Sequence, residues 1–151
     1  MKINEFIKNN LKVNNLAKSI DPIRKHMSVH MLTSSTLPHI ICKDGFSMSV
    51  QVGYSLYSTP KKVAKRYSAV EVGFPSEREP LIEDWAENLR EEALDYTDTV
   101  YPYVPVKVVN QVLKKHGGID LVKTLRNAEK FKHWSEFLPT HEFNSKILHG
   151  N

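Results

Sequence analysis

The chain contains a single cysteine among its 151 residues, so it cannot form an internal disulfide, and this favours a reducing, cytoplasmic location. Its 6 glycines form neither a Walker pattern nor a dinucleotide fingerprint. No apolar run approaches the roughly 20 residues that cross a bilayer, and the start becomes polar again too soon for a secretory signal. Internal repeats are also lacking. With 40% hydrophobic and 25% charged residues, the composition is typical of one globular domain.

Charge is distributed unevenly along the chain. The net charge is +4, yet nine acidic residues face only two arginines between Glu77 and Asp98, a local balance of −7. The remainder carries +11 and all 7 histidines. Such asymmetry affects partners and encounter rates more than it affects the fold.

The clearest structural signal is a pair of strand-like runs around Asp44-Gly45. This pattern predicts a hairpin over 39–52 with a primed turn, in which both central residues take positive φ. Pro102 cannot donate to a ladder, so the strand that contains it is expected at a sheet edge. The predicted strands are 39–43, 46–52, 67–74 and 99–104.

Helices are predicted within 3–18, over 22–32, over 80–94, from Pro105 to His116, and from Asp120 onward. The third follows a capping-box pattern, Ser76 to Glu79, and has an apolar stripe of Leu81, Trp85 and Leu89. The last is expected to bury Leu121, Leu125, Ala128 and Phe131. The patterns together predict an α+β fold: a small antiparallel sheet of three or four strands packed against several helices. The domain 1–151 would have a core at 39–119 and helical extensions at 1–38 and 120–151.

The residue types of known catalytic and metal sites do not combine convincingly. His39 and Cys42 resemble a base and a thiol nucleophile, but alternation along a strand points them to opposite faces, so Cys42 is expected to be a buried structural residue. His26 and His30 have a helical metal-ligand spacing, yet no Glu follows His26 as zinc hydrolases require. We therefore expect no catalytic residues, no metal and no cofactor, and hence no enzyme.

Two surfaces could bind a partner. The acidic helix could dock on a basic protein through Glu83, Glu87 and Glu91, with electrostatic steering of the encounter. Alternatively, the 54–67 loop interleaves cations that neutralise phosphates with rings that stack on bases. The residues of this nucleic-acid alternative are Tyr54, Tyr57, Lys61, Lys62, Lys65, Arg66 and Tyr67.

Several stretches resemble a family of small, uncharacterised proteins encoded by bacteriophages and prophages. They are 41–51 (Ile-Cys-Lys-Asp-Gly-Phe-Ser-Met-Ser-Val-Gln), 70–77 (Val-Glu-Val-Gly-Phe-Pro-Ser-Glu), 99–106 (Thr-Val-Tyr-Pro-Tyr-Val-Pro-Val) and 116–119 (His-Gly-Gly-Ile). The resemblance covers about residues 41–119. It implies a viral accessory protein in the cytoplasm of a bacterial host.

The leading functional hypothesis is therefore a non-catalytic phage accessory protein that acts by stoichiometric protein binding. An inhibitor of a bacterial defence system, such as an anti-CRISPR protein that binds a nucleic-acid-binding effector, would fit. The alternative hypothesis is a nucleic-acid-binding module that uses the 54–67 loop, and a third hypothesis is an unrecognised hydrolase. A membrane is not an expected partner.

Overall fold

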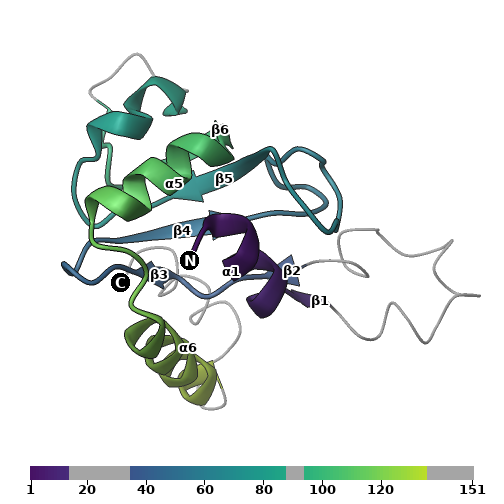
Figure 1. Ribbon diagram of the computed structural model, residues 1–151, viewed down its shortest axis with the longest axis vertical. Coiled ribbons are helices and arrows are strands. Elements are labelled where there is room, and N and C mark those ends of the chain that lie inside the picture. Colours follow the sequence, from purple (N-terminus) through teal and green to yellow (C-terminus); the bar gives the residue numbers. More distant parts are fainter. Residues whose placement is uncertain (14–34, 88–93, 136–151) are drawn as a thin grey trace, which may run out of the picture.

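A small antiparallel sheet forms the centre of the molecule (Figure 1). The computed structural model describes residues 1–13, 35–87 and 94–135, and the side chains of 1–11, 37–87 and 94–130. The four strands of the sheet, in spatial order, are β3 (Ile40–Ile41), β4 (Ser47–Gln51), β5 (Ala69–Gly73) and β6 (Val100–Pro105). A second, two-stranded sheet pairs β1 (Lys12–Val13) with β2 (Ser35–Thr36).

Helices cover one face of the four-stranded sheet, which confirms the predicted α+β fold. The helical elements are α1 (Ile3–Asn10), the 3-10 helix η1 (Pro80–Trp85), α5 (Val106–Lys115) and α6 (Leu121–Ser135). Helices α1 and α5 lie on the same face, while α6 extends away beside β3 (Figure 1). The predicted helix over 22–32 lies outside the described residues. In the part of the chain that the structure describes, no helix is long and apolar enough to cross a membrane.

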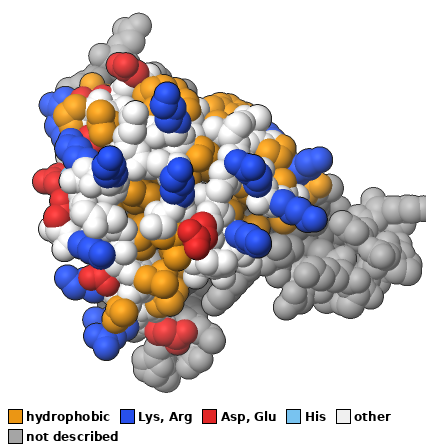
Figure 2. All heavy atoms as spheres, in the orientation of Figure 1, with side chains coloured by type: hydrophobic (Ala, Val, Ile, Leu, Met, Phe, Trp, Pro, Cys, Tyr) orange, Lys and Arg blue, Asp and Glu red, His pale blue; other side chains and the backbone are white. Residues whose placement is uncertain are grey.

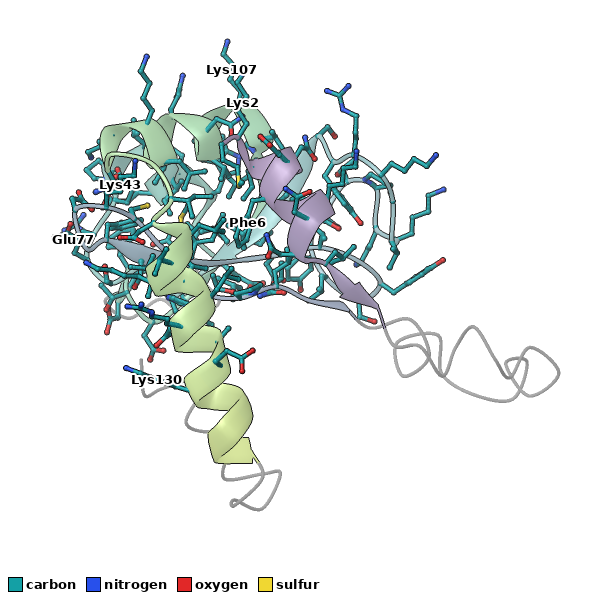
Figure 3. The ribbon with its side chains drawn as sticks, turned by 60° about the horizontal axis from the view of Figure 1, so that its bottom comes forward. Lys2, Phe6, Lys43, Glu77, Lys107 and Lys130 are labelled. Atoms are coloured by element: carbon teal, nitrogen blue, oxygen red, sulfur yellow. The ribbon has the colours of Figure 1, made fainter. Side chains whose placement is uncertain are left out.

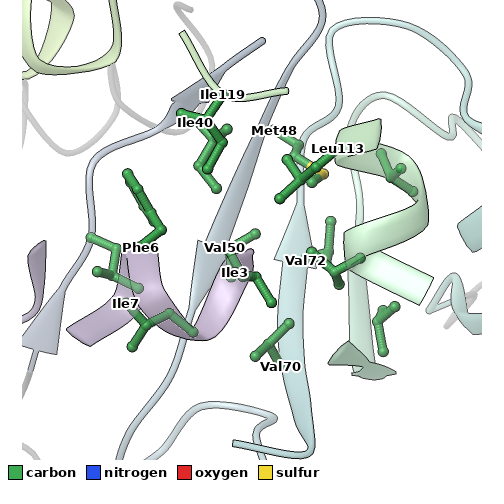
Figure 4. Close-up of a cluster of buried hydrophobic side chains, with 14 of the residues drawn as sticks. Ile3, Phe6, Ile7, Ile40, Met48, Val50, Val70, Val72, Leu113 and Ile119 are labelled. Atoms are coloured by element: carbon green, nitrogen blue, oxygen red, sulfur yellow. The ribbon is translucent and has the colours of Figure 1, made fainter. Parts of the chain in front are cut away.

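The core lies between this face of the sheet and the two helices. Alternation along β4 and β5 turns one side of each strand inward, and the inward side chains are fully buried (Figure 4). The buried side chains include Met48 and Val50 of β4, Val70 and Val72 of β5, Ile3, Phe6 and Ile7 of α1, and Val109, Val112 and Leu113 of α5. Each such side chain contributes about 1.5–3 kcal/mol on burial. Helix α1, which falls in the predicted N-terminal extension, is therefore part of the core.

The predicted hairpin is confirmed, but its turn differs from the prediction. Strand β3 pairs with β4, and only Gly45 of the two turn residues has a positive φ, at 97°. The amide of Gly45 donates to the carbonyl of Cys42, and the amide of Cys42 donates to the carbonyl of Phe46. These bonds define a three-residue loop that ends in a left-handed glycine. Asp44 accepts a hydrogen bond from the amide of Phe46 through its side chain, so it stabilises the loop without positive φ.

The predicted acidic helix is a short 3-10 helix in the described residues, and its cap is Glu79 instead of Ser76. The Ser76 hydroxyl accepts a hydrogen bond from the amide of Ser47, so the predicted capping box does not form. Ile82 is the buried residue of η1, whereas Leu81 of the predicted stripe is 39% exposed. Residues 88–93 lie outside the described part.

Helix α5 and the start of α6 agree with the prediction. Helix α5 begins after Pro105 and ends at His116, and Gly117 and Gly118 have positive φ as expected for a helix C-terminus. Asp120 caps α6 by accepting from the amide of Lys123.

The inward face of α6 differs from the prediction. Leu121 and Leu125 are 37% and 40% exposed, and Thr124 is the residue that is buried. Thr124 contacts β3, because its hydroxyl accepts a hydrogen bond from the amide of Ile41. The predicted stripe is therefore wrong for these two leucines. The side chain of Phe131 lies outside the described ones.

The two edges of the sheet are treated differently. Strand β6, with Pro102, is at an edge, as predicted. The other edge, β3, is covered by residues 116–120, whose backbone exchanges hydrogen bonds with 41–44. Covering an edge in this way satisfies backbone groups that would otherwise be free to pair with another chain.

Candidate functional site

A hollow with a basic rim lies between the start of α1 and the length of α5. It has a volume of about 510 Å³ and includes Lys2, Lys107 and Lys114 in its lining. Lys107 and Lys114 are seven residues apart on α5, which places them on the same side of that helix. Lys2 projects from α1 beside Lys107 on the outer side, while Phe6 points inward (Figure 3).

A second basic hollow lies between the other side of α1 and the loop that precedes β5. Its volume is about 770 Å³, and its lining includes Lys8 from α1 together with Lys65 and Arg66 from the loop. The apolar part of the lining comes from Leu11 and Ala64. The loop cations that the sequence suggested are therefore joined by a lysine from a distant part of the chain.

Asn4 fixes the position of α1 against the loop. Its side-chain oxygen accepts from the amide of Tyr67 at 2.9 Å, and its side-chain nitrogen donates to the carbonyl of Tyr67 at 3.0 Å. The amide of Ile3 donates to the side chain of Asn110 on α5 at 2.8 Å. Helix α1 is thereby hydrogen-bonded to both elements that complete the hollows, so the hollows keep a fixed spatial relation.

The surface formed by Lys2, Lys8, Lys65, Arg66, Lys107 and Lys114 is called the basic face below. Among the residues that the structure describes, Glu5 is the one acid in the linings of these two hollows. Across the described residues, no ion pair joins any of the six cations to a carboxylate. Figure 2 shows Lys and Arg side chains spread over this side of the molecule with few acids among them. The basic face is consequently a source of uncompensated positive potential.

The remaining residues of the predicted 54–67 site lie farther along the same loop. Lys61 and Lys62 are exposed, and Tyr54 and Tyr57 are half-buried. The ring of Tyr57 lies 5.7 Å from that of Tyr103 on β6, and the Lys61 ammonium lies 5.3 Å from the centre of the Tyr57 ring. Tyr103, which the sequence did not single out, therefore belongs with this group.

Tyr67 has a structural role in place of the predicted contact with nucleic acid. It is only 4% exposed. Its hydroxyl donates to the carbonyl of Lys62 and accepts from the amide of Ala64. These bonds hold the loop in its bend, so Tyr67 positions Lys65 and Arg66 but cannot stack on a base.

The predicted protein-binding carboxylates are less available than the sequence suggested. Both oxygens of Glu83 accept hydrogen bonds from the Arg78 guanidinium, at 2.9 and 3.0 Å. Glu87 is half-buried and Glu91 lies outside the described residues. Arg78 also lies 4.4 Å from the centre of the Tyr96 ring. A large part of the Glu83 charge is therefore compensated within the molecule.

A buried charged network, which the sequence did not predict, surrounds His116 at the end of α5. His116 is 7% exposed and stacks on Phe46, with ring centres 4.0 Å apart. Its Nδ1 lies 2.6 Å from Asp44 Oδ2, and its Nε2 lies 2.7 Å from Oε1 of the fully buried Glu79. Lys115 donates to the other oxygen of Glu79 at 2.9 Å.

The pKa values in this network follow from burial and pairing. Burial alone would lower the pKa of His116, but hydrogen bonds to Asp44 and Glu79 outweigh it and raise that pKa above 6.5. For Glu79, burial acts to raise the pKa, and bonds from the Leu81 amide, Lys115 and His116 bring it below 4.5 instead. With both ring nitrogens of His116 occupied by carboxylates, the network joins the hairpin turn, η1 and α5.

The thiol chemistry that the sequence analysis set aside has no support in the geometry. Cys42 is fully buried, and burial, with the nearby Asp44 charge, raises the pKa of its thiol to about 11. Burial lowers the pKa of His39 to about 4. His26 and His30 lie outside the described residues. Within the described ranges, no three His, Cys, Asp or Glu side chains are placed to hold a metal ion.

Comparison with known proteins identifies no relative: no family model, no curated protein and no solved structure matches this chain. The resemblance to phage-encoded proteins therefore stays a prediction.

Proposed function

We propose that this protein binds nucleic acid through the basic face. The observation that carries the proposal concerns the described residues: six cations that have no ion-pair partner among them converge around two hollows whose described lining contains one acid. Lysine and arginine side chains without internal partners are free to neutralise phosphates, with release of the counterions bound there. The basic face shares Lys65 and Arg66 with the 54–67 loop that the sequence suggested, and its other four cations come from the region of α1 and from α5.

The spacing of the cations suits a phosphate backbone. Lys2, the N-cap of α1, and Lys8 in its last turn are six residues apart, which corresponds to about 9 Å along the axis and to different sides of the helix. Successive phosphates of one strand of a duplex advance by about 3.4 Å, so this distance spans roughly three nucleotide steps. A strand that passes along α1 would therefore have to bend around the helix to contact both hollows.

Salt dependence provides the quantitative test. If all six cations contact phosphates, affinity should fall about 10³-fold between roughly 50 and 200 mM salt. The measurement is fluorescence anisotropy of a labelled oligonucleotide titrated with the protein at several salt concentrations. The double variants K65Q/R66Q and K107Q/K114Q should each weaken binding and reduce the slope of log K against log salt by about 1.4 to 1.8.

A matched control comes from α6. Lys123 and Lys130 are exposed and lie outside both hollows. The double variant K123Q/K130Q removes the same net charge, so it separates a local contact from a general effect of charge. An equal loss in all three double variants, or no measurable binding at low salt, would contradict the proposal.

The hypothesis of a phage accessory protein that binds a host or phage protein stays a second prediction. Its test is capture of one stoichiometric partner from bacterial lysate with the wild-type protein but not with a variant in which Glu83, Glu87 and Glu91 are replaced by lysine. Loss of capture on K65Q/R66Q alone would instead assign the partner to the basic face.

A further inference from the structure

Two tyrosines form an aromatic surface at the β6 edge of the sheet. Tyr103 of β6 is 41% exposed, although its neighbours Tyr101 and Val104 are fully buried. The Tyr57 and Tyr103 rings lie 5.7 Å apart and are inclined by 56°. The rings make a tilted contact, and because Tyr103 is partly exposed, the part of its ring that does not meet Tyr57 is open to a third planar group.

The backbone holds both tyrosines in place. Tyr103 has a φ of 54°, a left-handed conformation that bulky residues rarely adopt. Its amide donates to the carbonyl of Tyr57 at 3.2 Å, and the amide of Tyr57 donates to the Glu71 carboxylate at 3.3 Å. A strained residue persists only where its surroundings fix it, and such residues concentrate at binding sites.

Lys61 connects the aromatic surface with the basic face. Its ammonium lies over the Tyr57 ring at 5.3 Å from the centre, and its loop continues to Lys65 and Arg66. A cation beside an open ring pair matches one nucleotide, because the ammonium can contact the phosphate while the base lies on the ring. The Glu71 carboxylate, which accepts a hydrogen bond from the backbone amide of Tyr57, disfavours a phosphate near this tyrosine and so favours a base there.

We propose that Tyr57 and Tyr103 form a stacking site for an unpaired base, so that the ligand of the basic face is single-stranded nucleic acid. This inference rests on the proposed nucleic-acid binding. Bases of a duplex are already stacked within the helix and offer the rings no face, whereas a single strand offers each base in turn. Because every base has a flat face, the site is expected to prefer single strands over duplexes without preferring a particular base sequence.

The test compares ligands that differ only in their bases. The probes are a labelled oligothymidylate of about 16 nucleotides, an abasic oligomer of equal length and charge, and a duplex of equal length. Removal of the bases should weaken binding about 5- to 150-fold at fixed salt, and the single strand should bind more tightly than the duplex.

Protein variants assign this loss to the two rings. Y57L and Y103N should weaken binding of oligothymidylate and leave binding of the abasic oligomer unchanged; asparagine tolerates the left-handed backbone at 103. The control is Y96L, because Tyr96 is a half-buried tyrosine that lies beside Arg78 and lines neither hollow. Circular dichroism and the thermal midpoint verify that each variant is folded.

The outcomes separate the two proposals. Equal affinity for oligothymidylate and the abasic oligomer, tighter binding of the duplex, or wild-type affinity in both tyrosine variants would overturn the stacking site and leave nucleic-acid binding intact. Failure of every oligomer to bind would remove both proposals.

Discussion

Replacing Glu79 with glutamine removes one charge from the interior while it keeps the shape of the side chain. In the native protein Oε2 accepts from the Leu81 amide and from Lys115, and Oε1 faces His116 Nε2. All three neighbours are donors when His116 is protonated. An amide has one acceptor and one NH₂ group, so in E79Q one end must confront a donor unless His116 loses its Nε2 proton.

The expected loss of stability in E79Q corresponds to the hydrogen bond between Glu79 and His116. A hydrogen bond between a fully buried carboxylate and an imidazolium contributes about 1.5–3 kcal/mol. The pKa of His116 should fall in E79Q, because a negative partner that raises it has gone. The cost of the substitution should therefore depend on pH.

The direction of each pKa shift determines the pH range in which His116 and Glu79 stabilise the fold. His116 has a folded pKa above its ordinary 6.5, so its contribution to stability is fully present below about pH 6.5 and is lost as the pH rises through the folded value. Glu79 has a folded pKa below its ordinary 4.5, so its contribution is present above about pH 4.5 and is lost as the pH falls through the folded value. The interaction between Glu79 and His116 therefore stabilises the fold most between about pH 4.5 and about pH 6.5.

Thermal and urea unfolding of wild type and E79Q at about pH 6 and about pH 9 measure the effect. At the lower pH the midpoint of E79Q should fall by about 3–12 °C, and at the higher pH the difference should shrink. E77Q is the control, because Glu77 is exposed and two residues away. An equal loss at both pH values, or an unchanged NMR titration of His116, would refute the reasoning.

Three further predictions concern the core and α6. Phe6→Ala should lower the free energy of unfolding by about 3–5 kcal/mol in urea titrations, because the ring is fully buried; a loss below about 1 kcal/mol would mean that α1 does not belong to the core. Thr124→Val should cost about 1–3 kcal/mol by the same measurement, since it leaves the Ile41 amide without its acceptor at 3.0 Å, whereas Lys123→Ala should have little effect. Cys42 should react slowly with a thiol reagent in the native protein and rapidly in urea, because it is buried with a pKa raised to about 11; rapid native reaction would place it at the surface.

Local signals in the sequence predicted the elements whose ends depend on one or two residues. Pro105 and Gly117-Gly118 delimit α5 because proline suits a helix start and glycine tolerates the left-handed conformation at its end. Pro102 indicated the sheet edge, because proline has no amide hydrogen to donate to a neighbouring strand. Lys65 and Arg66 of the basic face were predicted because they are neighbours in sequence.

The remaining features depend on contacts between distant residues. Asp44 and Glu79 are 72 and 37 residues from His116, so no local pattern predicts that they meet there. The same contact explains the absent capping box, since the Glu79 carboxylate is engaged by Lys115 and His116 as well as by the start of η1. For the basic face, the spacing of Lys107 and Lys114 on α5 was a usable signal, but the contributions of Lys2 and Lys8 depend on where α1 packs.

The two hydrogen bonds from the Asn4 side chain to the backbone of Tyr67 hold α1 beside both hollows. Additions or deletions near Met1 therefore change those hollows. A tag fused before Met1 would stand at the mouth of the hollow that Lys2 borders and would compete there with any ligand. Trimming the chain past residue 10 would remove a wall shared by both hollows, together with three fully enclosed side chains. Binding should therefore be measured on protein that carries no added residues before Met1 and keeps all of α1.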